Sequence, residues 1–357
     1  MRGGHVAVIG SVAEGEDLAK RVGHPVATPV GGREDGRGGI ETPCRTRRHT
    51  GFKGTANEAP GSLSLAMADR AHEMIESSGG VWITQHDLGG PRSNTRVPVL
   101  LFAHATGFHG QVFGPLASFL NDQFRCVALD LRGHGTSELP PGTGMAWSGM
   151  ADDIVAALAS DHFPMGPLHG IGHSMGGAAL VLAAARQPDL FRSLWLYEPV
   201  IVPPEDGMLP DGDNTMSEGA ARRRERFESL EQAYENYRSK PPLDQLHPDA
   251  LRAYVDGGFS SSPDGSVTLL CRPSIEAEVF RHAAASGAWD NVAALEIPVA
   301  VVVGRPEEVG PGAFAPAIAD ALPRGVLIER PHLGHFGPLE DPAAMAEDVS
   351  AWVQANP

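Results

Sequence analysis

Short apolar runs of strand length alternate with helical patterns along most of this chain, and this alternation limits its possible folds more than any other feature. From residue 80 onward the pattern predicts strands at 81–84, 97–103, 124–131, 168–172, 193–197, 297–303 and 325–329. It predicts helices between them at 111–120, 150–159, 176–186, 313–322 and 342–353. The run from Val97 to Ala103 is apolar throughout, as expected of a strand buried on both faces. The sequence therefore predicts an α/β fold, with a mostly parallel central sheet flanked by helices.

The alternation is interrupted between residues 203 and 290. This stretch is rich in charge and proline and contains helical segments such as Ala220 to Tyr237. We interpret it as a helical cap inserted between two sheet strands, lying over the carboxyl ends of the strands, where ligands of open α/β sheets bind. The α/β core is then expected at 76–202 and 291–357.

The first 75 residues differ from the rest. Gly31 to Gly39 is glycine- and charge-rich, Arg45 to Lys53 is basic and polar, and neither has a sustained helical or strand period. We expect residues 1–75 to form a disordered extension.

Composition excludes several classes of protein. The formal net charge is -16, and the residues after 80 carry all of it, so nucleic acid and anionic membrane surfaces are unsuitable partners. No apolar run approaches the roughly 20 residues needed to span a bilayer. The three cysteines are too few and too scattered for a disulfide framework or a zinc site, and suit a reducing cytoplasm. They are Cys44, Cys126 and Cys271.

A possible nucleophile occurs at the junction of a predicted strand and a predicted helix. Gly172-His173-Ser174-Met175-Gly176 fits the pattern G-x-S-x-G in full. Small residues at 172 and 176 allow a sharp turn that lifts the Ser174 hydroxyl above the sheet. The amino end of the following helix favours negative charge that develops there.

A serine hydroxyl is a weak nucleophile until an imidazole accepts its proton. His335 lies between the last predicted strand and the last predicted helix, in a loop that can reach over the sheet edge. His332 is a nearby alternative, but it lies closer to the strand. We predict His335 as the base.

The segment 104–108, His-Ala-Thr-Gly-Phe, follows the buried strand that ends at Ala103. A loop at this place can direct a backbone N–H at an oxyanion. Thr106 and Met175, the residue after the serine, are the two expected donors.

The acidic partner of the histidine is less well defined by the sequence. The motif order places it between residues 174 and 335. Glu307 follows the strand at 299–303 and is the first choice, while Glu198, after the strand at 193–197, is the main alternative. Glu308 is a third candidate.

Residues 80–355 resemble the α/β-hydrolase fold family. The resemblance rests on GHSMGG at 172–177 and on DLRGHGTS at 130–137, which is similar to the D-x-R-G-x-G-x-S loop of capped members. That loop is mainly structural in the family, so the resemblance implies no catalytic role for Asp130 or His134. It implies Ser174 as nucleophile, His335 as base, and Thr106 with Met175 as oxyanion donors. Ala105 stands where glycine is usual, and Glu307 where aspartate is commoner.

These observations predict a serine hydrolase that acts on a small ester or related carbonyl compound through an acyl-enzyme, without a metal or organic cofactor. Hydrolysis of a carbon–carbon bond or a lactone would use the same catalytic residues. A binding protein of hydrolase fold without turnover is the other class, and the retained serine and histidine weigh against it. The sequence does not reveal the substrate or the oligomeric state.

Overall fold

The computed structural model describes residues 46–48, 72–92, 96–204, 212–306 and 310–357. These residues contain a nine-stranded sheet, ordered β1-β2-β3-β5-β4-β6-β7-β11-β12. The strands are β1 (Thr46–Arg48), β2 (His72–Glu76), β3 (Trp82–Gly89), β4 (Val99–Ala103), β5 (Arg125–Asp130), β6 (Leu168–His173), β7 (Ser193–Tyr197), β11 (Val299–Val303) and β12 (Gly325–Glu329). The six strands from β5 to β12 pair in parallel, and β1, β2 and β3 are antiparallel. The predicted mostly parallel sheet is confirmed.

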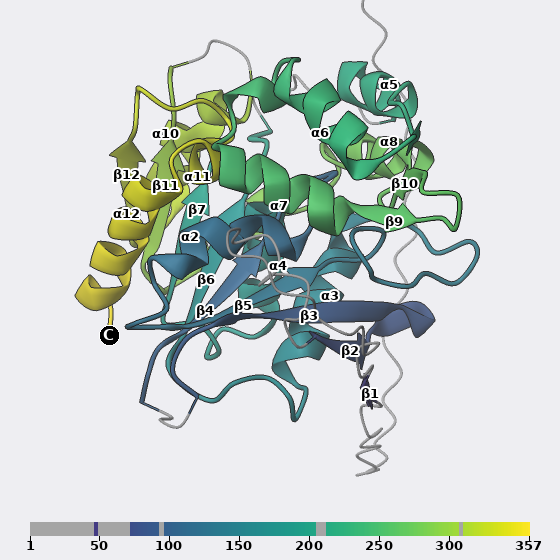
Figure 1. Cartoon of the computed structure of the whole chain (residues 1–357). Coiled ribbons are helices and arrows are strands. Elements are labelled where there is room, and N and C mark those ends of the chain that lie inside the picture. The colour runs from purple at the N-terminus through teal and green to yellow at the C-terminus, as the bar shows by residue number, and fades with distance from the viewer. Residues whose placement is uncertain (1–45, 49–71, 93–95, 205–211, 307–309) are drawn as a thin grey trace, which may run out of the picture. The chain divides into compact units, whose positions relative to one another are not determined.

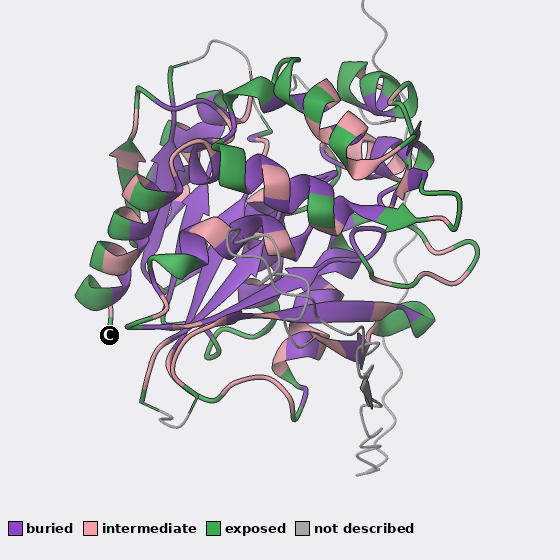
Figure 2. Cartoon of the chain, viewed as in Figure 1, coloured by how far each residue is buried: buried purple, intermediate pink, exposed green. Residues whose placement is uncertain are grey.

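Helices cover both faces of this sheet (Figure 1). One face packs against α3 (Trp147–Leu158), α4 (Met175–Arg186), α9 (Trp289–Val292) and α10 (Pro311–Ala321). The other packs against α2 (Gly114–Ser118), α7 (Pro248–Gly258) and α12 (Pro342–Ala355). Each face has its own apolar core, and Figure 2 shows the central strands buried between the two layers. Strands buried on both faces explain the unbroken apolar runs in the sequence.

The segment between β7 and β11 lies over one edge of the sheet, at the top of Figure 1. We call residues 212–292 of this segment, all of which the structure describes, the cap segment. It contains α5 (Thr215–Ala221), α6 (Leu230–Arg238), η3 (Leu243–Gln245), α7, α8 (Pro273–Arg281) and α9. It also contains a three-stranded antiparallel sheet of β8 (Arg226–Phe227), β10 (Val267–Leu269) and β9 (Phe259–Ser261). The insertion is therefore not purely helical.

The helical segment predicted from Ala220 to Tyr237 is interrupted in the structure. Helix α5 ends at Ala221, and α6 begins only after Ser229, whose side chain accepts a hydrogen bond from the amide of Gln232. A serine that caps a new helix in this way stops the earlier helix from continuing through it. The strand β8 fills the gap between the two helices.

The sheet begins earlier than expected. Strand β1 lies within residues 1–75 and β2 begins there, at His72, and β2 pairs along its whole length with β3. The buried side chains of Met74 and Ile75 explain this pairing, since they contribute to the cores. The remainder of the expected extension, 1–45 and 49–71, lies outside the described residues.

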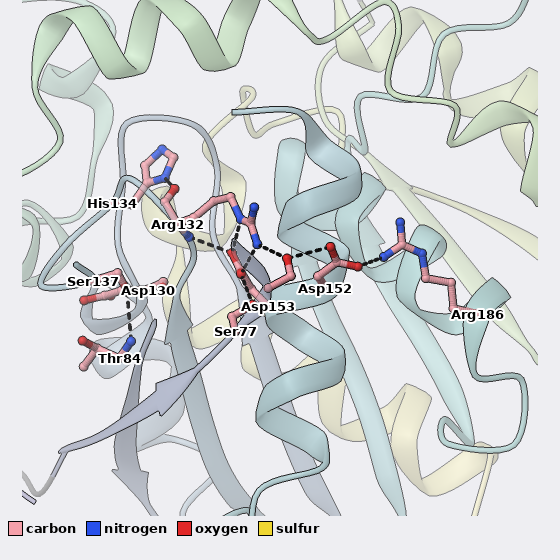
Figure 3. A network of polar contacts seen from close by, with 10 residues as sticks. Ser77, Thr84, Asp130, Arg132, His134, Ser137, Asp152, Asp153 and Arg186 are labelled. Carbon is pink, nitrogen blue, oxygen red and sulfur yellow. Dashed lines mark hydrogen bonds and ion pairs between the residues drawn. The ribbon is translucent and has the colours of Figure 1, made fainter. Parts of the chain in front are cut away.

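The loop at 130–137 is fixed by a polar network (Figure 3). Asp153 on α3, fully buried, accepts hydrogen bonds from the Arg132 backbone amide at 2.9 Å and from its Nη2 at 2.7 Å. Ser137 Oγ donates to the Asp130 carbonyl and accepts from the Thr84 amide on β3. These contacts tie the loop to α3 and β3, as expected of a structural segment.

The remaining short helical segments are the 3-10 turns η1 (Ser78–Gly80) and η2 (Gly110–Phe113) and the short helix α11 (Gly337–Glu340). Among the described residues, no helix combines the length and apolarity needed to cross a bilayer.

Candidate active site

Ser174 occupies the turn between β6 and α4. Its backbone has φ 56° and ψ −119°, a conformation that side-chain-bearing residues rarely adopt. Its carbonyl accepts hydrogen bonds from the amides of Gly177 at 3.0 Å and Val200 at 3.2 Å, and its own amide donates to the Tyr197 carbonyl at 3.0 Å. The turn is thus held by α4 and by β7 with the residues that follow it, which places Ser174 at the amino end of α4.

Close backbone approach explains the glycines around Ser174. A Cβ on Gly176 would lie 2.2 Å from the Ala103 carbonyl oxygen, and one on Gly172 would lie 2.6 Å from Gly177 Cα. Any larger residue at either position would push α4 away from β4 and β6. The spacing G-x-S-x-G is therefore a packing requirement of this turn.

His335 lies in the loop after β12, and its Nδ1 is 2.7 Å from Glu198 Oε2. The Glu198 side chain is only 4% exposed, and its other oxygen, Oε1, accepts from the Gly304 amide at 2.9 Å. Glu198 also has a positive φ, of 40°. Within the described residues, Ser174 and Glu198 are the only non-glycine residues with positive φ. In the structure His335 is therefore paired with Glu198, which the sequence offered as the alternative acid.

Glu307, the preferred acid, and Glu308 lie outside the described residues. His332 is exposed and does not line the cavity described below, in contrast to His335. Asp130 and His134 are also absent from that lining among the described residues.

Two backbone N–H groups lie beside Ser174. The amide of Met175 is the first of α4, and the amide of Thr106 is in the loop after β4. In the part of the chain that the structure describes, neither donates a hydrogen bond to another protein group. Both residues are buried, and an unpaired backbone amide at such a position can bind a negatively charged oxygen.

Two residues that sequence reasoning missed hold the histidine loop. His173 Nε2 lies 2.7 Å from the His335 carbonyl, and the Tyr197 hydroxyl donates to the Gly334 carbonyl at 2.7 Å. Burial, followed by the neighbouring His335, lowers the pKa of His173 well below its usual value, so this ring is neutral. The sequence gives only a weak signal that His173 holds the histidine loop: it is a polar residue within a buried strand.

A cavity of about 640 Å³ lies above these groups. The α/β core contributes Thr106, Phe108, Ser174 and His335 to its walls. The cap segment contributes residues of α5, α6, α7 and α8 and of the connections between them. The serine and the imidazole therefore open into one cavity between the core and the cap segment.

The model of the Alpha/beta hydrolase family matches residues 100–348. A 2-(acetamidomethylene)succinate hydrolase from Mesorhizobium japonicum is 41% identical over 100 residues, which are 27% of this chain and 34% of that protein. A pimeloyl-[acyl-carrier protein] methyl ester esterase from Chromobacterium violaceum is 27% identical over 67% of this chain and 87% of its own. The protein phosphatase methylesterase 1 of Mus musculus is 34% identical over 40% of this chain and 37% of its own. The first and third matches thus span little more than a third of those relatives.

Solved structures share the fold. The crystal structure of E-2-(acetamidomethylene)succinate hydrolase has a TM-score of 0.65 at 23% identity and covers 80% of this chain and 99% of its own. The esterase RhEst1 from Rhodococcus has a TM-score of 0.60 at 20% identity, covering 80% and 99%. At these identities the likeness concerns the fold alone.

Proposed function

This chain belongs to the alpha/beta hydrolase family, and from that premise we propose that it is a serine hydrolase that cleaves a small carboxylic ester through an acyl-enzyme. The observation that carries the proposal is the juxtaposition of a strained serine turn, a histidine paired with a buried carboxylate, and two unengaged amides around one cavity. Each component performs one part of acyl transfer.

In the first step Ser174 Oγ attacks the ester carbonyl carbon, and His335 takes the hydroxyl proton. Glu198 holds His335 at Nδ1, so Nε2 is the nitrogen that accepts this proton. The buried carboxylate fixes the tautomer and stabilises the imidazolium that forms. The imidazolium then gives the proton to the departing alkoxide, leaving an acyl group on Ser174.

In the second step water replaces the alcohol. His335 removes a proton from the water, the resulting hydroxide attacks the acyl carbon, and the proton returns to Ser174 Oγ as the carboxylic acid leaves. Both steps pass through a tetrahedral oxyanion, which the amides of Thr106 and Met175 bind. Each donor contributes about 3 kcal/mol of barrier reduction.

Two relatives named above are methyl ester esterases, which supports an ester of a small alcohol as the substrate. The cavity lies between the core and the cap segment, which supports an acyl group small enough to fit beneath the cap segment. We also propose that residues 203–290 act as the cap that admits the substrate.

We place the reaction in the cytoplasm. The side chains of Cys126 and Cys271 are buried, which suits a reducing compartment, while Cys44 lies outside the described residues. The negative charge of the chain favours a small-molecule substrate over nucleic acid.

The test is pre-steady-state hydrolysis of 4-nitrophenyl acetate. An acyl-enzyme gives a burst of nitrophenolate that approaches one equivalent per enzyme when deacylation is slower than acylation. Mass spectrometry of quenched enzyme should then find an acetyl group on Ser174. Ester hydrolysis that proceeds with an acyl group on another residue would contradict the mechanism.

A further inference from the structure

We propose that the substrate carries a carboxylate on its acyl part, and that basic residues of the cap segment, chiefly Arg223, bind this group. The inference rests on the proposed function and specifies its substrate as a short half-ester of a dicarboxylic acid.

The charge of the cavity wall is opposite to that of the molecule. Among the described residues, four basic ones line the cavity, Arg222, Arg223, Arg224 and Lys240, against one carboxylate, Glu276. The whole chain has only 28 basic residues and a net charge of -16. An excess of positive charge in one concave site of a negatively charged protein attracts an anionic ligand to that site.

Arg223 is the best placed of the four. Its side chain is 21% exposed, whereas that of Arg222 is 71% exposed. A less exposed charge is less screened by solvent and salt, so it interacts more strongly with a bound anion. The guanidinium stays charged in any environment that a folded protein offers.

The surroundings of Arg223 orient its guanidinium. Nη1 donates to Glu276, and Nη2 donates to the hydroxyls of Tyr254 at 2.5 Å and Tyr237 at 3.2 Å. Within the described residues these are the hydrogen bonds of the Arg223 guanidinium, and they use only part of its five N–H donors. An oriented group with donors in reserve binds a carboxylate without losing side-chain entropy.

Arg223 is paired with Glu276, whereas two other cations of the cavity wall, Arg224 and Lys240, have no acidic partner within the described residues. Arg224 donates to the Arg226 carbonyl and to Gln232 Oε1, each at 2.8 Å. Lys240 donates to Asn236 Oδ1 at 2.6 Å. Because these acceptors carry no charge, both cations add to the positive field in the cavity. Arg222, by contrast, has Glu218 at 3.6 Å.

The position of Arg223 limits the length of the substrate. A Cβ on Gly107 would lie 2.5 Å from Glu276 Oε1 and 3.2 Å from Arg223 Nη1. Gly107 follows Thr106 directly, so the Arg223–Glu276 pair lies beside the loop that we expect to bind the ester oxygen. Only a few carbon atoms then fit between the ester carbonyl and the carboxylate.

The test compares monomethyl succinate with methyl 4-methylpentanoate, in which an isopropyl group replaces the carboxylate. Methanol release gives kcat/KM for both. We expect the wild type to favour the half-ester at least 10-fold, and Arg223→Gln to lower that ratio 10- to 100-fold, mainly through KM. High salt should also lower it.

Two further variants keep the test decisive if Arg223→Gln does not fold. The double variant Arg224→Gln/Lys240→Gln changes only exposed residues and should lower the ratio about 3- to 10-fold. Arg238→Gln on α6 is the matched control, because Arg238 is exposed, pairs with Glu235 and is not among the residues that line the cavity.

Equal rates for the two esters, or a ratio unchanged in all cavity variants, would overturn the inference and leave the proposed function intact. Turnover of neither ester, together with no acyl group on Ser174 after the nitrophenyl acetate reaction, would overturn both.

Discussion

Backbone strain marks the candidate site at the scale of single residues. Ser174 and Glu198 directly follow β6 and β7, and each has a positive φ despite carrying a side chain. Such conformations cost of order 1–3 kcal/mol and persist where the surrounding structure imposes them, often at functional sites. The strain at Glu198 therefore favours it over a surface carboxylate as the partner of His335.

We predict that Glu198→Gln lowers kcat by about 10³- to 10⁴-fold, because an amide neither fixes the required tautomer nor stabilises the imidazolium. Glu307→Gln is the control and should retain kcat within about twofold. Steady-state hydrolysis of 4-nitrophenyl acetate measures both. A large loss in the Glu307 variant, with Glu198→Gln nearly unaffected, would reverse the assignment.

Local patterns in the sequence predict Ser174, His335 and the two oxyanion amides, since each lies in a motif next to a recognisable strand or helix, and the structure places Thr106, Ser174 and His335 around one cavity. For the acid, the sequence ranks Glu307 above Glu198 without deciding between them, because either of two strand ends can present a carboxylate to the histidine. The choice depends on how the loops after β7 and β11 fold, including the Gly304 amide that holds Glu198. The sequence does not encode that geometry in any short pattern.

At the scale of elements, the close packing of α4 against the sheet determines where the Ser174 hydroxyl points. Gly176 touches the carbonyl of Ala103 at the end of β4, so the helix can approach the strand only because residue 176 has no side chain. In the cap segment, too, a local contact of one residue determines where a helix begins, and the sequence pattern did not reveal it. There the helical period continued across Ser229, but the capping bond of that residue starts a new helix.

Gly176→Ala should destabilise the protein by about 1–3 kcal/mol, because the added methyl group overlaps the Ala103 carbonyl. It should also lower kcat by displacing Ser174. Gly144→Ala is the matched control, since nothing lies within 4 Å of a Cβ at that position. Urea unfolding measures both variants. Equal stability of the two variants would show that the turn tolerates a side chain at residue 176.

At the scale of the whole molecule, several buried histidines link stability to pH. Burial lowers the pKa of His104 to about 3 and that of His134 and His169 to about 4. The unfolded chain takes up protons at these rings below about pH 6.5, whereas the folded chain does not. Their stabilising effect is therefore complete above pH 6.5 and is lost as the pH falls toward the folded values.

We predict that the free energy of unfolding falls between pH 7.5 and pH 5, at most by about 1.4 kcal/mol per pH unit for each of these histidines. His169→Gln should make the decline shallower, because one proton fewer binds on unfolding. The exposed His332→Gln serves as the control and should leave the slope unchanged. Urea titrations at several pH values provide the measurement, and a flat profile over this range would contradict the prediction.

The central claim is that Ser174 is an activated nucleophile, and covalent labelling with a fluorophosphonate tests it most directly. Intact-mass measurement should show one adduct per wild-type chain, and peptide mapping should place it on Ser174. Ser174→Ala should remain unlabelled, and His335→Ala should label at least 10²-fold more slowly because the proton acceptor is missing. No adduct on folded wild-type protein, or equal labelling of Ser174→Ala, would contradict the account.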